Sequence, residues 1–403
     1  MVKKKIAIVG GGITGLYLAY RLSPSYQVTI FEKDRQVGGL ISGFKLPNWD
    51  WSADNFYHHF FDSDKKLINL LEELSVTYFF KKPVTAIWQN NKLSAFSSPK
   101  DLILFPGLNL FDKLRLGVAV LSLKTFANYH LIPDREAIKI FPILMGQSSY
   151  RAVWEPLMRG KFGSYHNQVS AVWLWGRIKK RSAKLGYPQG GFSKLIEQLA
   201  KKIVDSGGQI KVNQPIKSIS QLKNFNKVIF TTPKAILDQI TNDRTISGKK
   251  TISYLASLNL VLSGHQPIIK KDLYWLNIAD PACPFVAIIN QAGLVKPCHH
   301  KNNYLTYIGG YYRQDDPVLA MSANDILAKF NPFIKKINPN FKIKNYQTRL
   351  NKYLWAQPIV TPGYQESLPP FKTKKKNTYL VNMEQIYPWD RGVNYAIELA
   401  DNS

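Results

Sequence analysis

Cysteine is scarce in this 403-residue sequence, which contains only Cys283 and Cys298. Two cysteines at that spacing form no zinc-binding pattern, no redox CxxC motif and no disulfide framework. The chain is therefore not expected to be a disulfide-rich secreted scaffold or a zinc protein, and we predict no metal site. A reducing compartment such as the cytoplasm fits this composition.

Long hydrophobic runs are also missing. No apolar stretch approaches the roughly 18 residues from which a membrane-spanning helix is recognised. Lys3–Lys5 precede only the short apolar run Ile6–Val9, which three glycines follow, so this segment does not have the features of a signal peptide. The sequence predicts a soluble cytoplasmic protein, or one attached peripherally to a membrane.

Acidic side chains are few, with 27 Asp and Glu against 54 Lys and Arg, and the formal net charge is +27. This balance favours an anionic membrane surface or an anionic ligand, or it reflects the composition of the lineage. Nucleic acid is not expected as a partner, because no zinc pattern or basic repeat accompanies the charge. A small-molecule substrate is the expected partner, and the oligomeric state is open.

The first 32 residues contain a complete dinucleotide-binding unit. Ile6–Val9 is a continuous apolar run that is typical of a strand buried on both faces. A G-x-G-x-x-G motif (Gly10, Gly12 and Gly15) leads from it into an amphipathic helix, and Val28–Phe31 forms a second strand that ends at Glu32. This order of elements indicates a βαβ fold with a nucleotide along its first crossover.

Each residue type in the unit has a physical reason. Gly10 permits the tight turn, Gly12 lets a pyrophosphate approach the backbone, and Gly15 lets the helix pack closely on the sheet. The helix N-terminus offers free N–H groups to phosphate, and Glu32 can accept the hydroxyl protons of a ribose. The predicted contacts of this unit with the dinucleotide are Gly10, Gly12, Ile13, Thr14, Gly15, Glu32 and Lys33.

The segment Glu32–Gly39 resembles the extended FAD fingerprint of the flavoprotein superfamily that includes monoamine oxidases, protoporphyrinogen oxidases, phytoene desaturases and UDP-galactopyranose mutases. The resemblance implies that Gly38 and Gly39 let the backbone approach the pyrophosphate and the flavin. Many members carry Arg after this pair, where this chain has Leu40. That difference weakens the assignment to a subfamily more than the assignment of the cofactor.

Two adjacent histidines lie in the segment Asp54–Phe61, which resembles part of the Gly-Pro-His-x-Phe-His segment near the flavin of UDP-galactopyranose mutases. Neighbouring side chains of a strand point to opposite faces, so at most one of His58 and His59 would face a flavin. Both are candidate catalytic residues. The alternative is one buried, hydrogen-bonded histidine beside one on the surface.

The middle of the chain predicts a substrate domain. Residues 102–123 are apolar and are flanked by Lys113, Arg115 and Lys124, which is typical either of a membrane-contacting helical pair or of the core of a helical domain. Segments around Tyr150 and Phe162 resemble bacterial protoporphyrinogen-oxidase-like proteins. The candidate substrate residues are aromatic or basic: Trp173, Tyr187, Tyr274, Tyr311 and Arg313. Such side chains suit an isoprenoid, a porphyrin or a sugar nucleotide, and Tyr311 with Arg313 would suit a pyrophosphate.

Three later segments complete the implied FAD site. Gln209–Val212 and Pro215–Ile219 are predicted to form a strand pair, in which Ile216 would contact the adenine. Thr231 ends the next predicted strand beside the cofactor. The C-terminal segment has the order strand, loop, glycine, helix, and the resemblance places this helix N-terminus at the flavin. The contacts implied there are Asp390, Gly392, Val393 and Asn394.

Together these features predict an α/β protein with a discontinuous Rossmann-type FAD-binding domain and an α+β substrate domain that combines an antiparallel sheet with helices. The predicted FAD-binding segments are 1–80, 190–245 and 355–403, and the substrate segments are 81–189 and 246–354. The expected function is hydride transfer from an apolar or conjugated substrate to N5 of a non-covalent FAD. The alternatives are a flavin-dependent isomerase like UDP-galactopyranose mutase and a flavin-binding scaffold without turnover.

Overall fold

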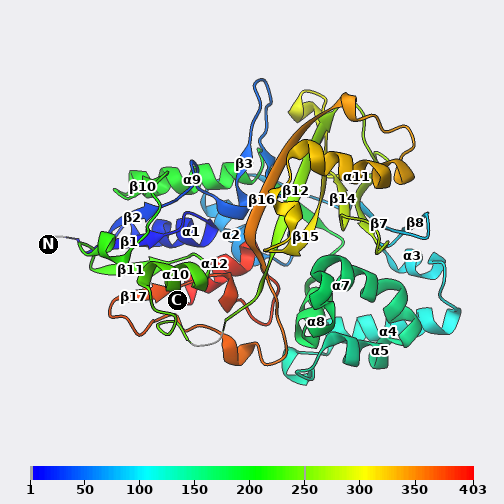
Figure 1. Ribbon diagram of the computed structural model, residues 1–403, viewed down its shortest axis with the longest axis horizontal. Coiled ribbons are helices and arrows are strands. Elements are labelled where there is room, and N and C mark those ends of the chain that lie inside the picture. The colour runs from blue at the N-terminus through cyan, green and yellow to red at the C-terminus, as the bar shows by residue number, and fades with distance from the viewer. Residues whose placement is uncertain (1–2, 249–250) are drawn as a thin grey trace.

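The computed structural model describes residues 3–248 and 251–403, so residues 1–2 of the predicted segment 1–80 and residues 249–250 of the predicted segment 246–354 lie outside the described residues. A parallel sheet with its helices forms one end of the molecule, and a group of helices with part of an antiparallel sheet forms the other (Figure 1). The chain thus has the predicted mixed α/β architecture.

The parallel sheet is built from segments far apart in the chain. Its strands run in the order β10, β2, β1, β11, β17, and every pair of neighbours is parallel. Their bounds are Gln209–Lys211, Gln27–Phe31, Lys5–Val9, Lys227–Phe230 and Thr378–Leu380, respectively. All five strands fall in the three segments that the sequence assigns to the FAD-binding domain, whereas the domain limits themselves stay a prediction.

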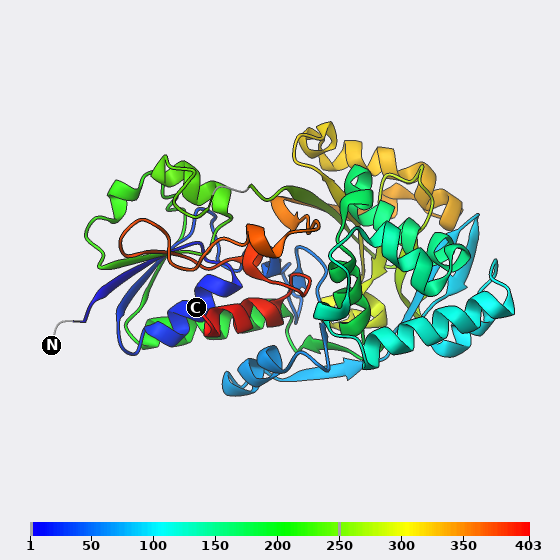
Figure 2. The ribbon, with the colours of Figure 1, turned by 90° about the horizontal axis from the view of Figure 1, so that it is seen from below.

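Helices cover both faces of this sheet, which explains why β1 is apolar throughout. Ile6 and Ile8 face one core, which α1, α9 and α12 close, and Ala7 and Val9 face a second core under α10. Figure 2 shows α12 beside α1. The bounds are Ile13–Leu22 for α1, Phe192–Asp205 for α9, Val393–Asp401 for α12, Lys234–Thr241 for α10 and Lys65–Glu73 for α2, which packs on α12.

A seven-stranded sheet lies between the parallel-sheet domain and helix α11 (Ala323–Ile337). Its order is β16, β12, β15, β14, β13, β7, β8, and it is antiparallel except between β13 and β7. The bounds are Tyr346–Pro358, Tyr254–Gly264, Tyr304–Arg313, Ala287–Asn290, Leu273–Ile278, Val84–Gln89 and Lys92–Ala95, respectively. Helix α11, which starts with a Ser322–Asp325 capping box, covers one face, and the other face meets the core of the parallel-sheet domain.

The remaining elements form two short sheets and a helical region. The short strands are β3 (Gly43–Phe44) with β4 (Ala53–Asp54), and β5 (Phe60–Phe61), β9 (Leu185–Pro188) and β6 (Tyr78–Lys81). The helices are α3 (Pro99–Leu104), α4 (Leu110–Thr125), α5 (Ala137–Met145), α6 (Gln147–Ser149), α7 (Glu155–Phe162) and α8 (Ala171–Lys180). They pack around a core of their own that includes Phe141, Phe162 and Trp175.

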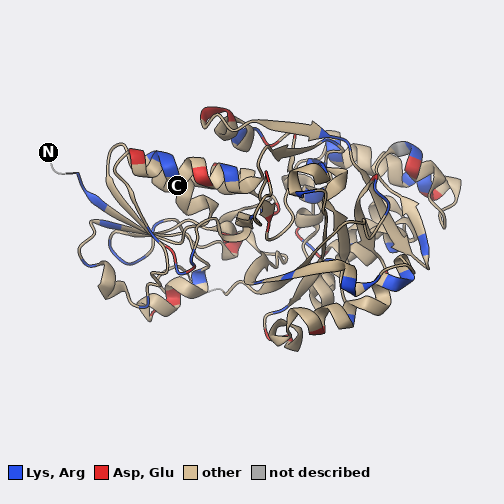
Figure 3. Cartoon of the chain, turned by 90° about the horizontal axis from the view of Figure 1, so that it is seen from above, with Lys and Arg blue, Asp and Glu red and all other residues tan. Residues whose placement is uncertain are grey.

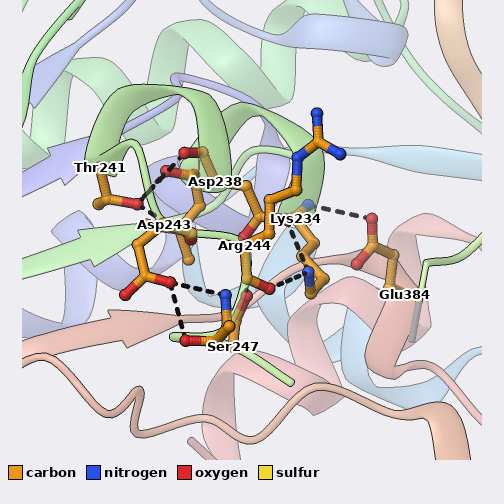
Figure 4. Close-up of polar contacts among 9 residues, drawn as sticks. Lys234, Asp238, Thr241, Asp243, Arg244, Ser247 and Glu384 are labelled. Carbon is orange, nitrogen blue, oxygen red and sulfur yellow. Dashed lines mark hydrogen bonds and ion pairs between the residues drawn. The ribbon is translucent and has the colours of Figure 1, made fainter. Parts of the chain in front are cut away.

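A buried polar network ties α10 to the C-terminal segment (Figure 4). The ammonium group of Lys234 pairs with the Asp238 carboxylate at 2.6 Å, and the backbone N–H of Lys234 donates to Oε1 of Glu384 at 3.0 Å. The hydroxyl of Tyr254, at the start of β12, donates to the same Glu384 oxygen at 2.9 Å. Burial raises the pKa of Glu384. The network joins the parallel-sheet domain to the seven-stranded sheet. None of its residues lies on β1 or α1, the two elements that the glycine motif connects.

One local prediction is wrong. The residues Pro215–Ile219 form no strand with Gln209–Val212; instead β10 pairs with β2 in parallel. Tyr187 lies in β9, between β5 and β6. The apolar segment 102–123 is divided between α3 and α4, and Asn109 caps the second of these helices.

Candidate active site

The glycine motif forms a rigid turn between β1 and α1. Gly10 has φ +109°, and a Cβ at this position would lie 2.7 Å from Oγ1 of Thr231. A Cβ on Gly15 would overlap the carbonyl oxygen of Gly10. The Thr231 hydroxyl donates to the Gly10 carbonyl at 2.9 Å, and this hydrogen bond stabilises the turn. Gly10 and Gly15 are thus required by the fold.

Gly12 differs from Gly10 and Gly15, because a Cβ on Gly12 would meet no atom within 4 Å. It caps α1 in an extended conformation, with φ −70° and ψ 179°, and no side chain covers the first N–H groups of the helix. The second glycine pair lies against it, since the N–H of Gly38 donates to the Gly11 carbonyl at 2.7 Å. The result is an open backbone cradle at a helix N-terminus, which fits a pyrophosphate.

Glu32 is buried, with 7% of its surface exposed, and its carboxylate supports the cradle. Oε2 accepts the N–H of Gly11 at 2.7 Å, and Oε1 accepts the N–H of Asp34 at 2.9 Å. A carboxylate has further lone pairs, so these bonds leave acceptor capacity for ribose hydroxyls, and that role stays a prediction. Lys33 is exposed and pairs with Asp34. Ile216 is half-buried and follows Gln214, whose N–H donates to the Glu32 carbonyl at 2.8 Å.

The C-terminal helix α12 also begins at a glycine without a side-chain cap. Gly392 is extended, with φ −178°, so its backbone conformation does not require glycine. A Cβ at this position would crowd the Tyr395 ring at 3.3 Å. The first N–H groups, including those of Val393 and Asn394, are available to a ligand. The Asn394 side chain accepts the N–H of Leu67 at 3.2 Å and so anchors α2.

Neither histidine of the Asp54–Phe61 segment is exposed, so the reading that places one of them on the surface is wrong. Nδ1 of His58 lies 2.7 Å from the Phe56 carbonyl, and Nδ1 of His59 lies 3.2 Å from the Tyr274 hydroxyl. Burial lowers the pKa of His58 to about 4 and that of His59 to about 3. Both imidazoles are therefore neutral near pH 7.

A buried carboxyl group lies beside the histidines. The Tyr187 hydroxyl donates to Oδ2 of Asp54 at 2.8 Å, and burial raises the pKa of Asp54 to about 7. Tyr187 and Tyr274 were predicted to contact substrate, but both are almost completely buried. Their hydroxyls are directed at Asp54 and at His59, respectively, so they belong to the support of this segment.

A second polar cluster, which we call the Asp390 cluster, lies next to the start of α12. It consists of Lys161, Trp173, Arg177, Tyr311, Gln357, Asp390 and Arg391. Oδ2 of Asp390 lies 3.1 Å from the Lys161 ammonium and 3.2 Å from the Arg177 guanidinium. Oδ1 accepts from Nε1 of Trp173 at 3.0 Å and from the Gln357 amide at 3.2 Å. Asp390 was expected among the cofactor contacts, but its carboxylate is occupied by these four partners.

The structure does not bring Arg313 to Tyr311, the two residues expected to suit a pyrophosphate together. Arg313 is exposed at the end of β15 and pairs with Asp315 at 2.8 Å. The guanidinium that meets the Tyr311 hydroxyl is that of Arg391, at 2.9 Å. Trp173, by contrast, lies inside the Asp390 cluster as a donor.

Sequence reasoning missed Lys161, Arg177, Gln357 and Arg391 as site residues. Lys161 lies on α7 and Arg177 on α8, whereas Gln357 ends β16, so no local pattern connects them. Arg391 directly precedes Gly392 in the C-terminal motif, and this position was the one available signal. Helix α8 reaches the motif because Gly176 lets it approach: a Cβ there would lie 3.0 Å from the Pro388 carbonyl oxygen.

Comparisons with known proteins agree with this geometry. A family model described as flavin containing amine oxidoreductase matches residues 13–247, more than half of the chain. Coproporphyrinogen III oxidase of Staphylococcus aureus is 24% identical over 271 residues, which cover 56% of this chain and 57% of that enzyme. The 4,4'-diapophytoene desaturase of Staphylococcus haemolyticus is 37% identical over 84 residues, 19% of this chain and 17% of that enzyme. The matched regions thus span little more than half of these curated relatives at most.

Solved structures extend the similarity to the whole fold. An oxidoreductase from Methanosarcina mazei has a TM-score of 0.76 at 14% identity and covers 99% of both chains. Reduced UDP-galactopyranose mutase has a TM-score of 0.72 at 15% identity, over 99% of this chain and 95% of that one. The family is flavin-containing, and the open glycine cradle fits FAD as the cofactor. Because the model of this family matches more than half of the sequence, the chain belongs to the flavin containing amine oxidoreductases.

Proposed function

We propose that the chain is an FAD-dependent oxidoreductase in which a hydride leaves a C–H bond of a bound organic substrate. Bound FAD would accept the hydride at N5 and pass the electrons to an acceptor. The observation that carries the proposal is that two helices of one domain, α1 at the Gly12 cradle and α12 at Gly392, begin without a side-chain cap. The first suits the pyrophosphate, and the second suits the ring where negative charge develops.

The chain's own residues act by binding and positioning. The His58–His59 segment is held by Asn55, whose carbonyl accepts from Asn259 at 2.7 Å and from Asn351 at 3.0 Å. These bonds fix the segment against β12 and β16, between the two domains. Because both imidazoles are neutral near pH 7, they would add no positive charge where hydride leaves the substrate. Positioning of this kind is the main contribution of protein groups in flavin chemistry.

The purified protein should be yellow and should contain about one FAD per chain. Anaerobic mixing with candidate substrates of three classes, porphyrinogens, linear polyenes and amines, should bleach the visible flavin band with only one class. The classes follow from the relatives' names and from the family description. A protein that binds FAD but is not bleached by any of the three classes would contradict the proposed oxidation of these substrates.

A second candidate function is isomerisation of a sugar nucleotide, as in a UDP-galactopyranose mutase. Two observations favour it: the shared fold, and the excess of cations in the Asp390 cluster, which suits a charged substrate. Incubation with UDP-galactose, with and without dithionite, separates the two functions. Conversion that occurs only with the reduced protein would support the isomerase, whereas flavin bleaching by an organic reductant without any isomerisation would support the oxidoreductase.

A further inference from the structure

Positive charge exceeds negative charge in the Asp390 cluster. Lys161, Arg177 and Arg391 contribute three cations, and Asp390 is the carboxylate that faces them. Lys161 and Asp390 are largely buried, with 18% and 9% of their side chains exposed, and Arg177 lies at the outer edge, with 43% exposed. A cluster with two uncompensated charges in a mostly dry environment is costly unless an anion completes it.

Arg391 is the cation without a carboxylate partner. Its Nε donates to Oε1 of Gln357 at 3.0 Å, and one terminal nitrogen donates to the Tyr311 hydroxyl at 2.9 Å. Both partners are neutral, and no ion pair of Arg391 occurs within residues 3–248 and 251–403. Arg391 and Lys161 lie on the Tyr311 ring at 5.8 Å and 5.6 Å from its centroid, respectively. The two cations thus flank one tyrosine.

The titration of Tyr311 reflects this excess of positive charge. Burial alone would raise the pKa of its hydroxyl, but the charges of Arg391 and Lys161 outweigh burial and lower it. Burial is also the main reason that the pKa of Lys161 is lowered. The local environment therefore favours the arrival of a negative charge from outside the cluster.

We propose that Lys161 and Arg391, with Tyr311 between them, bind an anionic group of the substrate, a carboxylate or a phosphate. This inference rests on the proposed function, because it assigns the cluster to the substrate that the flavin would oxidise. Asp390 and Arg391 immediately precede Gly392, the N-cap of α12, so a substrate anchored at the cluster would lie next to the start of this helix. A guanidinium beside a hydroxyl is well suited to the oxygen pairs of either anion.

The test uses the FAD-loaded protein, in which the glycine cradle is already filled. Calorimetric titration with succinate and, separately, with inorganic pyrophosphate distinguishes a carboxylate from a phosphate. Lys161→Met and Arg391→Gln should each weaken the preferred anion at least tenfold. Lys161→Arg should restore most of the affinity, which a purely structural role would not predict. Arg159→Gln is the matched control, because Arg159 lies on the same helix and pairs with Glu155 in solvent.

Each outcome decides the question. Unchanged anion affinity in Lys161→Met and Arg391→Gln proteins that retain FAD overturns the inference. A shifted flavin midpoint potential without loss of anion affinity assigns the cations to the flavin and also overturns it. If anions bind as expected but no substrate bleaches the flavin, the anion site stands and the proposed oxidation fails, so the two failures are distinguishable.

A second observation, independent of the first, concerns the outer face of the helical region. Sixteen large apolar side chains are exposed in the described residues, and eleven of them lie between residues 103 and 144. Leu110, Leu114, Val118 and Leu121 form a stripe along α4, at 79%, 66%, 56% and 60% exposure. The stripe lies opposite Leu116 and Leu123, which are buried. An apolar face of this extent on a folded domain marks a binding surface.

Two basic side chains join the neighbouring helices to this stripe. Lys113 donates to the Ile103 carbonyl at 2.6 Å, and Arg115 donates to the Ile143 carbonyl at 2.6 Å. The exposed pairs Ile103–Leu104 of α3 and Ile143–Leu144 of α5 are therefore held on the two sides of α4. We call the nine exposed apolar residues on α3, α4 and α5 the α4 face, and Figure 2 shows the long helix α4 along the border of the molecule.

Lysines and arginines gather at one end of the α4 face. Phe126, which is 83% exposed, directly follows α4. Lys124 donates to the Arg181 carbonyl at 2.6 Å, and Lys179 donates to the Ala127 carbonyl at 3.1 Å, so the end of α8 brings further positive charge beside Phe126. The chain as a whole carries +27, and Figure 3 shows Lys and Arg over both halves of the molecule. An apolar face with a basic border is complementary to anionic lipid headgroups above acyl chains.

We infer that the α4 face binds the surface of an anionic lipid bilayer. The contact would be interfacial, since no helix within the described ranges is long and apolar enough to cross a membrane. Helix α4 packs directly on α8, which carries Trp173 and Arg177 into the Asp390 cluster. A bilayer on this face would therefore lie one helix layer from the site.

Flotation with vesicles tests this inference. The wild-type protein should float with vesicles of phosphatidylglycerol and phosphatidylcholine, and much less with phosphatidylcholine alone. Replacing Leu110, Leu114 and Val118 together by Ser should reduce binding at least tenfold, whereas Ile343→Ser with Leu354→Ser, two exposed positions elsewhere, should not. Absence of vesicle binding overturns the inference. So does a concentration-dependent dimer that the triple variant abolishes, because the face would then bind a second copy.

Discussion

Replacement of Gly12 by Val should separate cofactor binding from folding. The structure supports this expectation at one position of the motif, because a Cβ on Gly12 meets nothing within 4 Å and its φ of −70° is open to any residue. The free energy of unfolding of the cofactor-free protein should therefore change by no more than about 1 kcal/mol, the usual cost of an unfavourable residue at a helix N-cap.

The same side chain would fill the cradle that faces Gly39, whose own Cβ position lies 3.3 Å from the Gly12 Cα. A pyrophosphate displaced from this backbone loses one or two hydrogen bonds to charged oxygen, each worth about 1.5–3 kcal/mol. A loss of about 1.5–6 kcal/mol lowers the FAD affinity by roughly tenfold to more than ten-thousandfold. The protein should be isolated colourless.

Gly15→Ala provides the contrast. Its Cβ would overlap the Gly10 carbonyl, so this variant should lose about 3 kcal/mol of stability even without FAD. Thermal unfolding of the cofactor-free proteins and fluorescence titration with FAD measure the two effects. A Gly12→Val protein that is yellow, or one that unfolds as easily as Gly15→Ala, would refute the assignment of Gly12 to the phosphates.

Three further predictions concern single buried charges. Glu32→Ala should weaken FAD binding by about 1–3 kcal/mol in the same titration, and an unchanged affinity would show that the carboxylate only supports the turn. The pKa of Asp54 is raised to about 7, so the folded state binds an extra proton between about pH 4 and 7 and wild-type stability falls as the pH rises through that window. Asp54→Asn should remove this fall, so its unfolding free energy relative to wild type should rise with pH; a difference that does not vary with pH would contradict the burial argument. Lys234→Met should cost about 3–5 kcal/mol in denaturant unfolding because it strands Asp238, and adding Asp238→Leu should recover part of the loss; no recovery would place the cost elsewhere.

The dinucleotide-binding unit could be predicted because its information is local. The apolar run Ile6–Val9, the glycine spacing and Glu32 all lie within 32 residues, and each element follows from a short pattern. The same holds for α11, whose capping box and apolar period are contiguous. The prediction of a strand at Pro215–Ile219 was wrong because the structure of this segment depends on distant residues. Its residues suit a strand, but the N–H groups of Asn213 and Gln214 donate to carbonyl groups in the segment 32–34.

The Asp390 cluster could not be predicted, because its partners are far apart in the chain. Lys161 and Asp390 are 229 residues apart, and only the packing of α7 and α8 against the C-terminal loop brings them together. The choice between Arg313 and Arg391 as the partner of Tyr311 depends on how β15 ends, which no local pattern encodes. The sequence of residues 102–123 could not distinguish a membrane-contacting helical pair from the core of a helical domain. Periodicity identifies an apolar helix face but does not show what covers that face.

The placement of α12 has a consequence for how the protein is made. Strand β11 lies between β1 and β17, and α12 packs against α1 and α2, so the Gly12 cradle gains its last supports from residues 227–230, 378–380 and 393–401. A chain that is still being synthesised lacks α12 until residues 393–401 have been made and have left the ribosome. Nucleotide loading should therefore follow the emergence of these residues, and premature termination after residue 380 should yield a species that cannot retain FAD and is exposed to proteases.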